Sequence, residues 1–195
     1  MVLIAELIAI SIGVPLGILV TRPAFTRLTT PIIGGANVGQ TIPSLAVIAI
    51  MAPILGFGLN SAIVALFIYG LLPILRNSYT GINNIDPAIV EAARGMGMTR
   101  GQIARRIELP LALPVIMAGI RISTVVTVGT AELAVLVGGA GLGKITLTGV
   151  VSRQALTILQ GAAPTAAMAV IMGSILERIE KWMTPWGLKA KAEMS

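Results

Sequence analysis

Cysteine and histidine are both absent from the 195 residues of this sequence. Without them the chain cannot form a disulfide or use a thiol nucleophile or a histidine general base, and it lacks the ligands of almost every zinc site. Charge is scarce too, because 11% of the residues are charged, whereas a soluble domain carries about 25%. These absences disfavour most enzyme classes and a soluble fold.

Hydrophobic residues make up 55% of the chain. A soluble core of this length could not hide so much apolar surface, so the excess must face lipid or other membrane helices. The net charge of +6 does not indicate nucleic-acid binding, because the basic residues stand at segment ends and not in patches interleaved with aromatic residues. We therefore expect one membrane domain over residues 1–195, embedded in a lipid bilayer.

Apolar segments of membrane-spanning character occur five times. The first resembles a signal peptide, but it lacks a basic start and a convincing small-residue cleavage site, so we interpret it as a retained span. No repeat or low-complexity tract is present. The sequence predicts an all-α polytopic transmembrane helix bundle with spans at about 2–20, 32–55, 61–75, 111–128 and 162–183.

Basic residues are concentrated in alternate connections between these spans. Eleven lie after span one, between spans three and four, or toward the C-terminus, whereas the other connections contain Lys144 and Arg153. Because basic residues are retained on the cytoplasmic side, this distribution predicts an external N-terminus and a cytoplasmic C-terminus in a plasma (inner) membrane.

The connection 86–110 has the signals of two short helices. Asp86 can cap the first helix and Pro87 suits its first position, while Gly95 and Gly97 permit a left-handed turn at its end. Thr99 and Gln102 have the spacing of a capping box at the start of the second helix. The apolar residues of this segment indicate either docking on a protein or contact with lipid headgroups, and the spacing favours neither.

The same segment resembles the EAA loop of binding-protein-dependent ABC importer permeases. Every fixed position of the EAA-x3-G-x9-I-x-LP pattern is filled, by Glu91, Ala92, Ala93, Gly97, Ile107, Leu109 and Pro110. The resemblance implies a cytoplasmic coupling helix between spans three and four, in which Glu91, Ala92, Ala93 and Gly97 contact an ATPase subunit.

Four longer stretches are similar to the glycine betaine, choline, carnitine and proline betaine branch of these permeases. They are residues 36–46, 65–82, 86–99 and 108–123, whereas the short start and Glu6 depart from that branch. The resemblance implies import of a compatible solute by alternating access. It also implies three protein partners, namely a cytosolic ABC ATPase dimer, a second permease subunit and an extracytoplasmic solute-binding protein. No cofactor is expected on this chain, and ATP and Mg would bind the partner ATPase.

Polar residues recur within the second predicted span. Asn37, Gln40, Thr41 and Ser44 have the spacing of one stripe on an otherwise apolar helix, in which Pro43 predicts a bend. Unpaired amides are costly in hydrocarbon, so the stripe predicts either interhelical hydrogen bonds, which we favour, or a candidate translocation path.

Arg121 and Glu132 are candidate buried charges in and after the fourth span. We expect Arg121 to reach the cytoplasmic interface or to pair with a carboxylate or carbonyls, in preference to a direct role with substrate. Glu132 lies about 16 Å further along a helix, too far for a direct pair, although a contact across a permease dimer stays open.

The last span predicts a packing or dimer face and an interfacial anchor. The small residues are Ala163, Ala166, Ala167, Gly173 and Ser174. Trp182 and Trp186, beside lysines, are typical of the cytoplasmic membrane boundary.

Residues 138–146 nearly match a phosphate-binding P-loop. The pattern fails because Ile145 stands where Ser or Thr must hold magnesium, so we predict a tight external turn. The chain therefore has no catalytic or metal-binding constellation of its own.

Three other functions compete with osmoprotectant import. They are a permease for methionine or another amino acid, an intramembrane enzyme that uses Glu6, Glu132 or Arg121, and a membrane scaffold. Only seven residues are aromatic, so no cation-π cage for a quaternary ammonium solute is evident, and specificity is expected mainly in the solute receptor.

Overall fold

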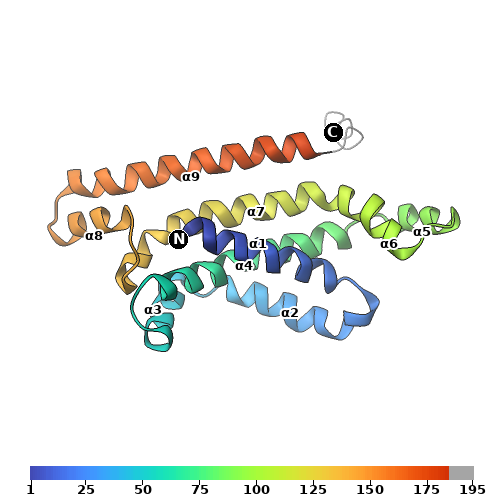
Figure 1. The fold of residues 1–195 in the computed structure, drawn as a ribbon, viewed down its shortest axis with the longest axis horizontal. Helices are drawn as coiled ribbons and strands as arrows, with labels where there is room; N and C mark the ends of the chain where they lie inside the picture. Colours follow the sequence, from blue (N-terminus) through green and yellow to red (C-terminus); the bar gives the residue numbers. More distant parts are fainter. Residues whose placement is uncertain (185–195) are drawn as a thin grey trace.

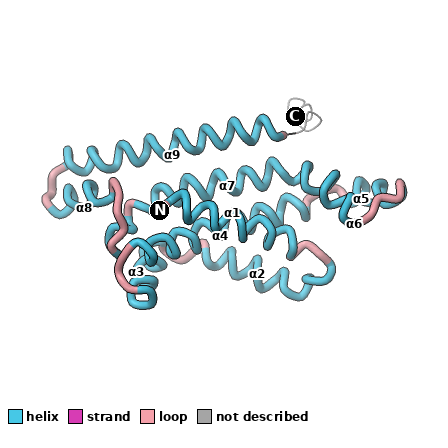
Figure 2. Tube along the Cα trace, in the orientation of Figure 1, coloured by secondary structure: helices cyan, strands magenta, loops and turns pink. Residues whose placement is uncertain are grey.

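A computed structural model describes residues 1–184 of the chain as a bundle of helices (Figure 1). Figure 2 shows that short loops join the helices, and residues 1–184 contain no strand. The elements are α1 (Val2–Leu19), η1 (Pro23–Phe25), α2 (Thr26–Gly39), α3 (Ser44–Leu55), α4 (Leu59–Asn83), α5 (Pro87–Gly95), α6 (Arg100–Ile103), η2 (Ala104–Glu108), α7 (Leu109–Ala131), η3 (Leu133–Val137), α8 (Gly143–Val151) and α9 (Ala155–Met183).

The core lies where α4 packs between α1 and α7. Glycines bring these backbones close together: a Cβ on Gly17 of α1 would lie 2.6 Å from the Leu75 carbonyl oxygen, and one on Gly119 of α7 would lie 3.1 Å from the Pro73 carbonyl oxygen. Small residues allow such approach in lipid, where dispersion replaces the hydrophobic effect as the main attraction between helices. Fully buried Ile74 fills the space beside them.

Four helical segments within residues 1–184 are long and apolar enough to cross a membrane, and the bent pair α2–α3 is a candidate fifth span. The predicted bundle of about five spans is therefore confirmed. The helices extend beyond several predicted limits, because α4 continues to Asn83 and α9 begins at Ala155. Continuous helical structure also joins the connection to the fourth span, over Arg100–Ala131, with a π-helical turn at η2.

The predicted span 32–55 is not one straight helix, because the chain bends sharply within it. The segment Pro23–Gly39 and helix α3 meet at 103°. Pro43 directly precedes α3 and has a non-helical backbone, with ψ of 132°. Proline disfavours helix in the residue before it and has no N–H to continue the helical hydrogen bonds, so α2 does not continue into α3.

Two ends of the bundle differ in composition. Figure 1 places α5, α6, the α1–α2 turn and the end of α9 toward one end, and α3 and α8 toward the other. An ion pair of 2.6 Å between Arg22 Nη1 and Glu108 Oε2 ties the α1–α2 turn to η2. The basic connections thus share an end, as the charge distribution predicts, while the side of the membrane that each end faces stays a prediction.

Candidate functional site

The segment α5–α6 has the local structure that its sequence predicts. The Ala88 amide donates to Asp86 Oδ1 at 2.9 Å, and Pro87 occupies the first turn of α5. Thr99 and Gln102 form the predicted capping box, in which the Thr99 amide donates to Gln102 Oε1 at 2.8 Å. These caps satisfy backbone donors at both helix starts, so the segment is an ordered projection.

The turn between the two helices depends on one glycine. Gly97 has φ of +81°, and its amide donates to the Arg94 carbonyl at 2.9 Å. Gly95, which we also expected to permit the left-handed turn, is instead the last residue of α5 and has no positive φ. A side chain at Gly97 would be strained, because L-residues rarely adopt this conformation.

The motif residues divide into an exposed and a buried group. Glu91, Ala92 and Gly97 are exposed, and the neighbouring Met96 is 74% exposed. Ala93 is 1% exposed, so its side chain is buried in this chain, and its contact with an ATPase stays a prediction. The three other motif positions lie where η2 continues into α7, with Ile107 and Pro110 half-buried and Leu109 exposed.

A basic groove adjoins this projection, and the sequence reasoning missed its acidic member. Arg22, Arg94, Arg100 and Glu108 line the groove, and Glu108 holds Arg22 across it. The available signal was Glu108 itself, a lone carboxylate just after Arg105 and Arg106. This ion pair connects the α1–α2 turn to the base of the projecting segment.

The four polar residues of the second predicted span gather around the α2–α3 break. Asn37 is exposed on α2, Gln40 and exposed Thr41 lie in the break, and Ser44 begins α3. They do not form the predicted stripe, because the helix ends at Gly39. Thr41 Oγ1 donates to the nearby Val38 carbonyl at 2.7 Å, and within residues 1–184 none of the four makes a side-chain hydrogen bond to another helix. Their membership of a translocation path stays a prediction.

A buried polar cluster joins the three core helices around Glu6. The Glu6 side chain is 5% exposed, and Thr124 Oγ1 donates to Glu6 Oε1 at 3.1 Å. Ser123 Oγ donates to the Gly70 carbonyl at 2.8 Å, and a Cβ on Gly70 would lie 2.9 Å from Thr127 Oγ1. The sequence places Glu6 near the end of its span, but the structure makes it a buried acid. The hydroxyl residues at 123, 124 and 127 were the signal that could have located its partners.

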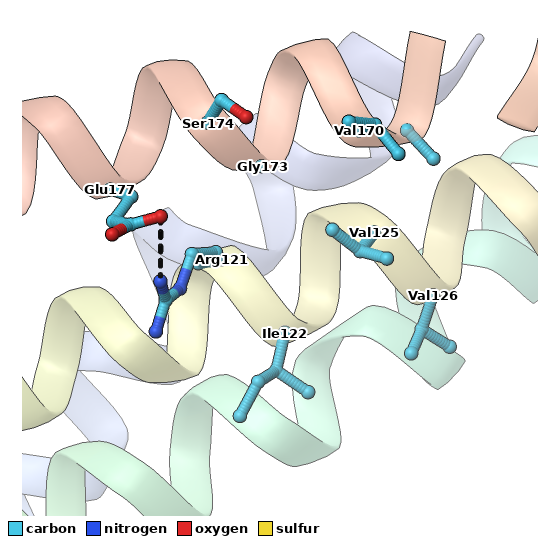
Figure 3. Close-up of a pocket in the computed structure, with 9 residues that line it drawn as sticks. Arg121, Ile122, Val125, Val126, Val170, Gly173, Ser174 and Glu177 are labelled. Atoms are coloured by element: carbon cyan, nitrogen blue, oxygen red, sulfur yellow. Dashed lines mark ion pairs between the residues drawn. The ribbon is translucent and has the colours of Figure 1, made fainter. Parts of the chain in front are cut away.

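Arg121 pairs with two carboxylates of α9, which confirms the expected pairing. Its Nη1 lies 3.6 Å from Glu177 Oε2, and its Nε lies 3.8 Å from Glu180 Oε2. Figure 3 shows Arg121 and Glu177 facing one another between α7 and α9. The Arg121 side chain is 34% exposed, so it is half-buried in a single chain, and its full burial stays a prediction.

Glu132 is half-buried and does not contact Arg121. Thr146 Oγ1 donates to Glu132 Oε1 at 3.3 Å, within the turn that resembles a P-loop. Gly143 in that turn packs directly on the Glu132 backbone, and a Cβ on Gly139 would lie 2.7 Å from the Ala134 carbonyl oxygen. These two glycines therefore allow the turn to pack closely on the chain just before it, at Glu132 and Ala134.

No constellation of catalytic or metal-binding side chains converges in residues 1–184. Glu6, Arg121 and Glu132 each contact different neighbours, and this part of the chain has no group of three His, Cys, Asp or Glu residues able to hold a metal ion. The described residues therefore form a helix bundle with an ordered basic end, in which the charged and polar side chains connect helices to one another.

The bundle and its capped, projecting segment are those of a membrane-embedded transport subunit. The chain belongs to the family of binding-protein-dependent transport system inner membrane components, whose model matches residues 13–186. Members of this family are permease components of ABC importers and are not themselves enzymes. The expected family resemblance is confirmed.

Two relatives extend over nearly the whole chain. The sequence is 44% identical over 193 residues to the choline transport system permease protein OpuBB of Bacillus subtilis, covering 99% of this chain and 88% of that protein. It is 45% identical over 181 residues to the carnitine transport permease protein OpuCD of Listeria monocytogenes, covering 92% of this chain and 80% of that protein.

The fold is also similar to that of a solved transporter. A structure of the MetNI methionine ABC transporter in an inward-facing conformation has a TM-score of 0.85 and 27% identity, with 95% of this chain and 92% of that chain covered.

The predicted anchors and small residues of α9 are only partly described. Trp182 is 84% exposed at the end of α9, whereas Trp186 lies outside the described residues. Gly173 faces Val125 of α7, and the other four small residues, Ala163, Ala166, Ala167 and Ser174, are exposed. Their face is thus uncovered in a single chain.

Proposed function

We propose that this chain is the permease subunit of an ABC importer for quaternary-ammonium compatible solutes such as glycine betaine, choline or carnitine. The observation that carries this proposal is the 44% identity to a choline permease over 99% of the chain. The methionine permease of the solved transporter is a more distant relative, at 27% identity, which makes methionine the second candidate.

In this proposal the segment α5–α6 couples the bundle to a separate ATPase. Its exposed Glu91, Ala92 and Gly97 suit close approach to another protein, because small residues admit a neighbouring surface and a carboxylate can pair with a basic side chain across the joint. ATP and Mg would bind that ATPase, since the segment of this chain that resembles a P-loop lacks the magnesium-binding hydroxyl, and its Gly139 and Gly143 pack on the backbone of Ala134 and Glu132.

The proposed orientation puts α5–α6 in the cytosol and the N-terminus outside. The excess of Arg and Lys at the end that contains α5 and α6 supports this assignment. The end with α3 and α8 would then face an extracytoplasmic solute receptor.

Transport requires a second permease subunit, and the uncovered face of α9 with Ala163, Ala166 and Ala167 is available to it. Two such subunits would enclose a path that opens alternately to each side. Closure of the ATPases would move α5–α6, and the continuous helical stretch Arg100–Ala131 would transmit that movement into the bilayer.

The substrate is tested by ligand-stimulated ATP hydrolysis in vesicles that contain the permease, its ATPase and its solute receptor. We expect glycine betaine, choline or carnitine to stimulate hydrolysis and methionine to have no effect. Stimulation by methionine alone would replace the proposed substrate class by the second candidate.

The coupling role is tested in the same vesicles with Gly97→Val, which places a β-branched side chain at φ of +81°. We expect solute uptake to fall at least tenfold, because the valine side chain would strain the turn that positions α5. Gly95→Ala is the matched control, since Gly95 lies in the same segment without positive φ and nothing lies within 4 Å of its missing Cβ. Uptake at the wild-type rate by Gly97→Val would contradict the coupling role.

A further inference from the structure

A groove of about 470 Å³ runs between α7 and α9, in the size range of small-molecule sites. Its walls are mostly apolar, with Ile122, Val125 and Val126 from α7 and Ala169 and Val170 from α9. Arg121 and Glu177 close one end, and Figure 3 shows their charged groups directed toward one another there. The groove therefore combines an apolar wall with one positive and one negative group.

The charged groups are loosely engaged. The Arg121–Glu177 and Arg121–Glu180 separations of 3.6 and 3.8 Å exceed the 2.7–2.9 Å typical of a charge-assisted hydrogen bond. Glu177 has an alternative partner, because Lys181 Nζ lies 2.7 Å from its Oε1. Arg121 can therefore release Glu177 without leaving that carboxylate unpaired.

Arg121 and Glu177 belong to two of the helices that are long and apolar enough to cross a membrane. Arg121 is the thirteenth residue of α7, about 18 Å from its start, and Glu177 lies about 9 Å from the end of α9, counted at 1.5 Å per residue. Ionisable residues within membrane-spanning helices face the interior of an assembly or a water-filled space, because hydrocarbon solvates them poorly. Half-exposed Arg121 and Glu177 thus indicate a wet or protein-covered groove.

We propose that this groove is a transit site for solutes that carry both a carboxylate and a quaternary ammonium group. The solute carboxylate would pair with Arg121, whose planar guanidinium binds carboxylates with two hydrogen bonds. The quaternary ammonium, which has no N–H donor, would lie beside the Glu177 and Glu180 carboxylates and the apolar wall. This inference rests on the proposed function and names the substrate class that one site within the path recognises.

The geometry also explains why such a site would bind the solute with low affinity, which a transport path requires so that the solute can leave. Glu177 must move away from Arg121 before the solute fits between them, so part of the binding free energy is used to separate the ion pair. When the solute leaves, the pair closes again and the site returns to its empty state.

The test compares solutes that differ in the carboxylate. Uptake of glycine betaine, carnitine and choline is measured with the complete transporter in vesicles, for the wild type and for Arg121→Gln. We expect the variant to lose at least tenfold more uptake of glycine betaine and carnitine than of choline, which has no carboxylate. Arg121→Lys, which keeps the positive charge, should restore part of the loss.

Three results would overturn the inference. They are an equal loss for all three solutes, no loss for any of them, or a wild type that carries choline alone. The proposed function fails separately, when the wild type carries none of the three solutes. Arg121→Gln and the wild type are also compared for assembly with the ATPase, so that a misfolded variant is recognised.

A second measurement leaves the charges intact. This chain has no cysteine, so Ser174→Cys provides a single thiol at the groove. We expect the water-soluble cation trimethylammonium-ethyl methanethiosulfonate to label it, and glycine betaine to slow that labelling severalfold. Failure of the reagent to react, or labelling that glycine betaine does not change, would contradict a solute site in this groove.

Discussion

The two faces of α7 are held in different ways. On one face, α7 packs against α4. In the most apolar stretch of each helix, 50% of the residues of the segment Arg100–Ala131 and 44% of those of α4 are buried. On the other face, α7 contacts α9, where 11% of the most apolar stretch is buried. The first contact brings glycine against backbone, whereas the second consists of side chains such as Val125 against Gly173 and of the Arg121 ion pairs. Helices α1, α4 and α7 therefore form a core within one chain, while α9 depends on what covers it in the membrane.

The largest effect is expected from Gly119→Val at the α4–α7 contact. A Cβ there would lie 2.5 Å from Asn77 Cβ and 3.1 Å from the Pro73 carbonyl oxygen, so the two helices must separate. We expect a loss of about 3 kcal/mol of stability, measured by thermal unfolding in detergent. Gly129→Val on the same helix is the control, because nothing lies within 4 Å of its missing Cβ. Equal stability of the two variants would show that the core is not held by this close contact.

An intermediate effect is expected from Glu6→Ala in the buried polar cluster. The change removes one of the two acceptors of Thr124, which keeps the Ile120 carbonyl, and leaves a cavity where the buried side chain stood, at a cost of about 2 kcal/mol. Glu6→Gln keeps an acceptor oxygen and adds a donor that can reach Thr127 Oγ1, which has no hydrogen-bond partner among the described residues. Its unfolding temperature should therefore stay near that of the wild type. A similar loss in both variants would mean that the core requires the acid itself.

The smallest effect is expected from Gly173→Ala at the α7–α9 contact. The new Cβ would lie 3.2 Å from Val125 Cγ2, and a side-chain methyl can move by a few tenths of an ångström. We expect a change of less than about 1 kcal/mol in the same unfolding measurement. A loss as large as that of Gly119→Val would remove the contrast between the two faces of α7.

Local signals in the sequence were sufficient for the ordered segment between the spans. Asp86, Pro87 and the Thr99–Gln102 pair act on their immediate neighbours, so the helix starts follow from a few adjacent residues. The existence of the membrane helices followed equally from apolar length. The ends of α4 and α9 did not, because polar residues continue a helix after the apolar run stops.

Contacts between distant segments could not be read in the same way. The partners of Arg121 lie on α9, more than fifty residues along the chain, so the sequence indicated a carboxylate without identifying it. Glu6 meets residues of α7 only after α1, α4 and α7 pack together. Pro43 indicated a bend in this span, but not a break as sharp as 103°, because apolar character alone does not distinguish a slightly bent span from a broken one.

The right-angle turn between α2 and α3 has a consequence for the surrounding lipid. The segment Pro23–Gly39 rises about 25 Å, which is less than the hydrocarbon thickness of about 30 Å. With α3 turned by 103°, its exposed Ile50 and Ile54 lie sideways along the membrane and add little to the height of the crossing. The apolar surface of the protein is therefore shorter than the hydrocarbon core on this side. Hydrophobic mismatch there would thin the neighbouring leaflet, so the stability of this side would depend on the acyl-chain length of the lipid.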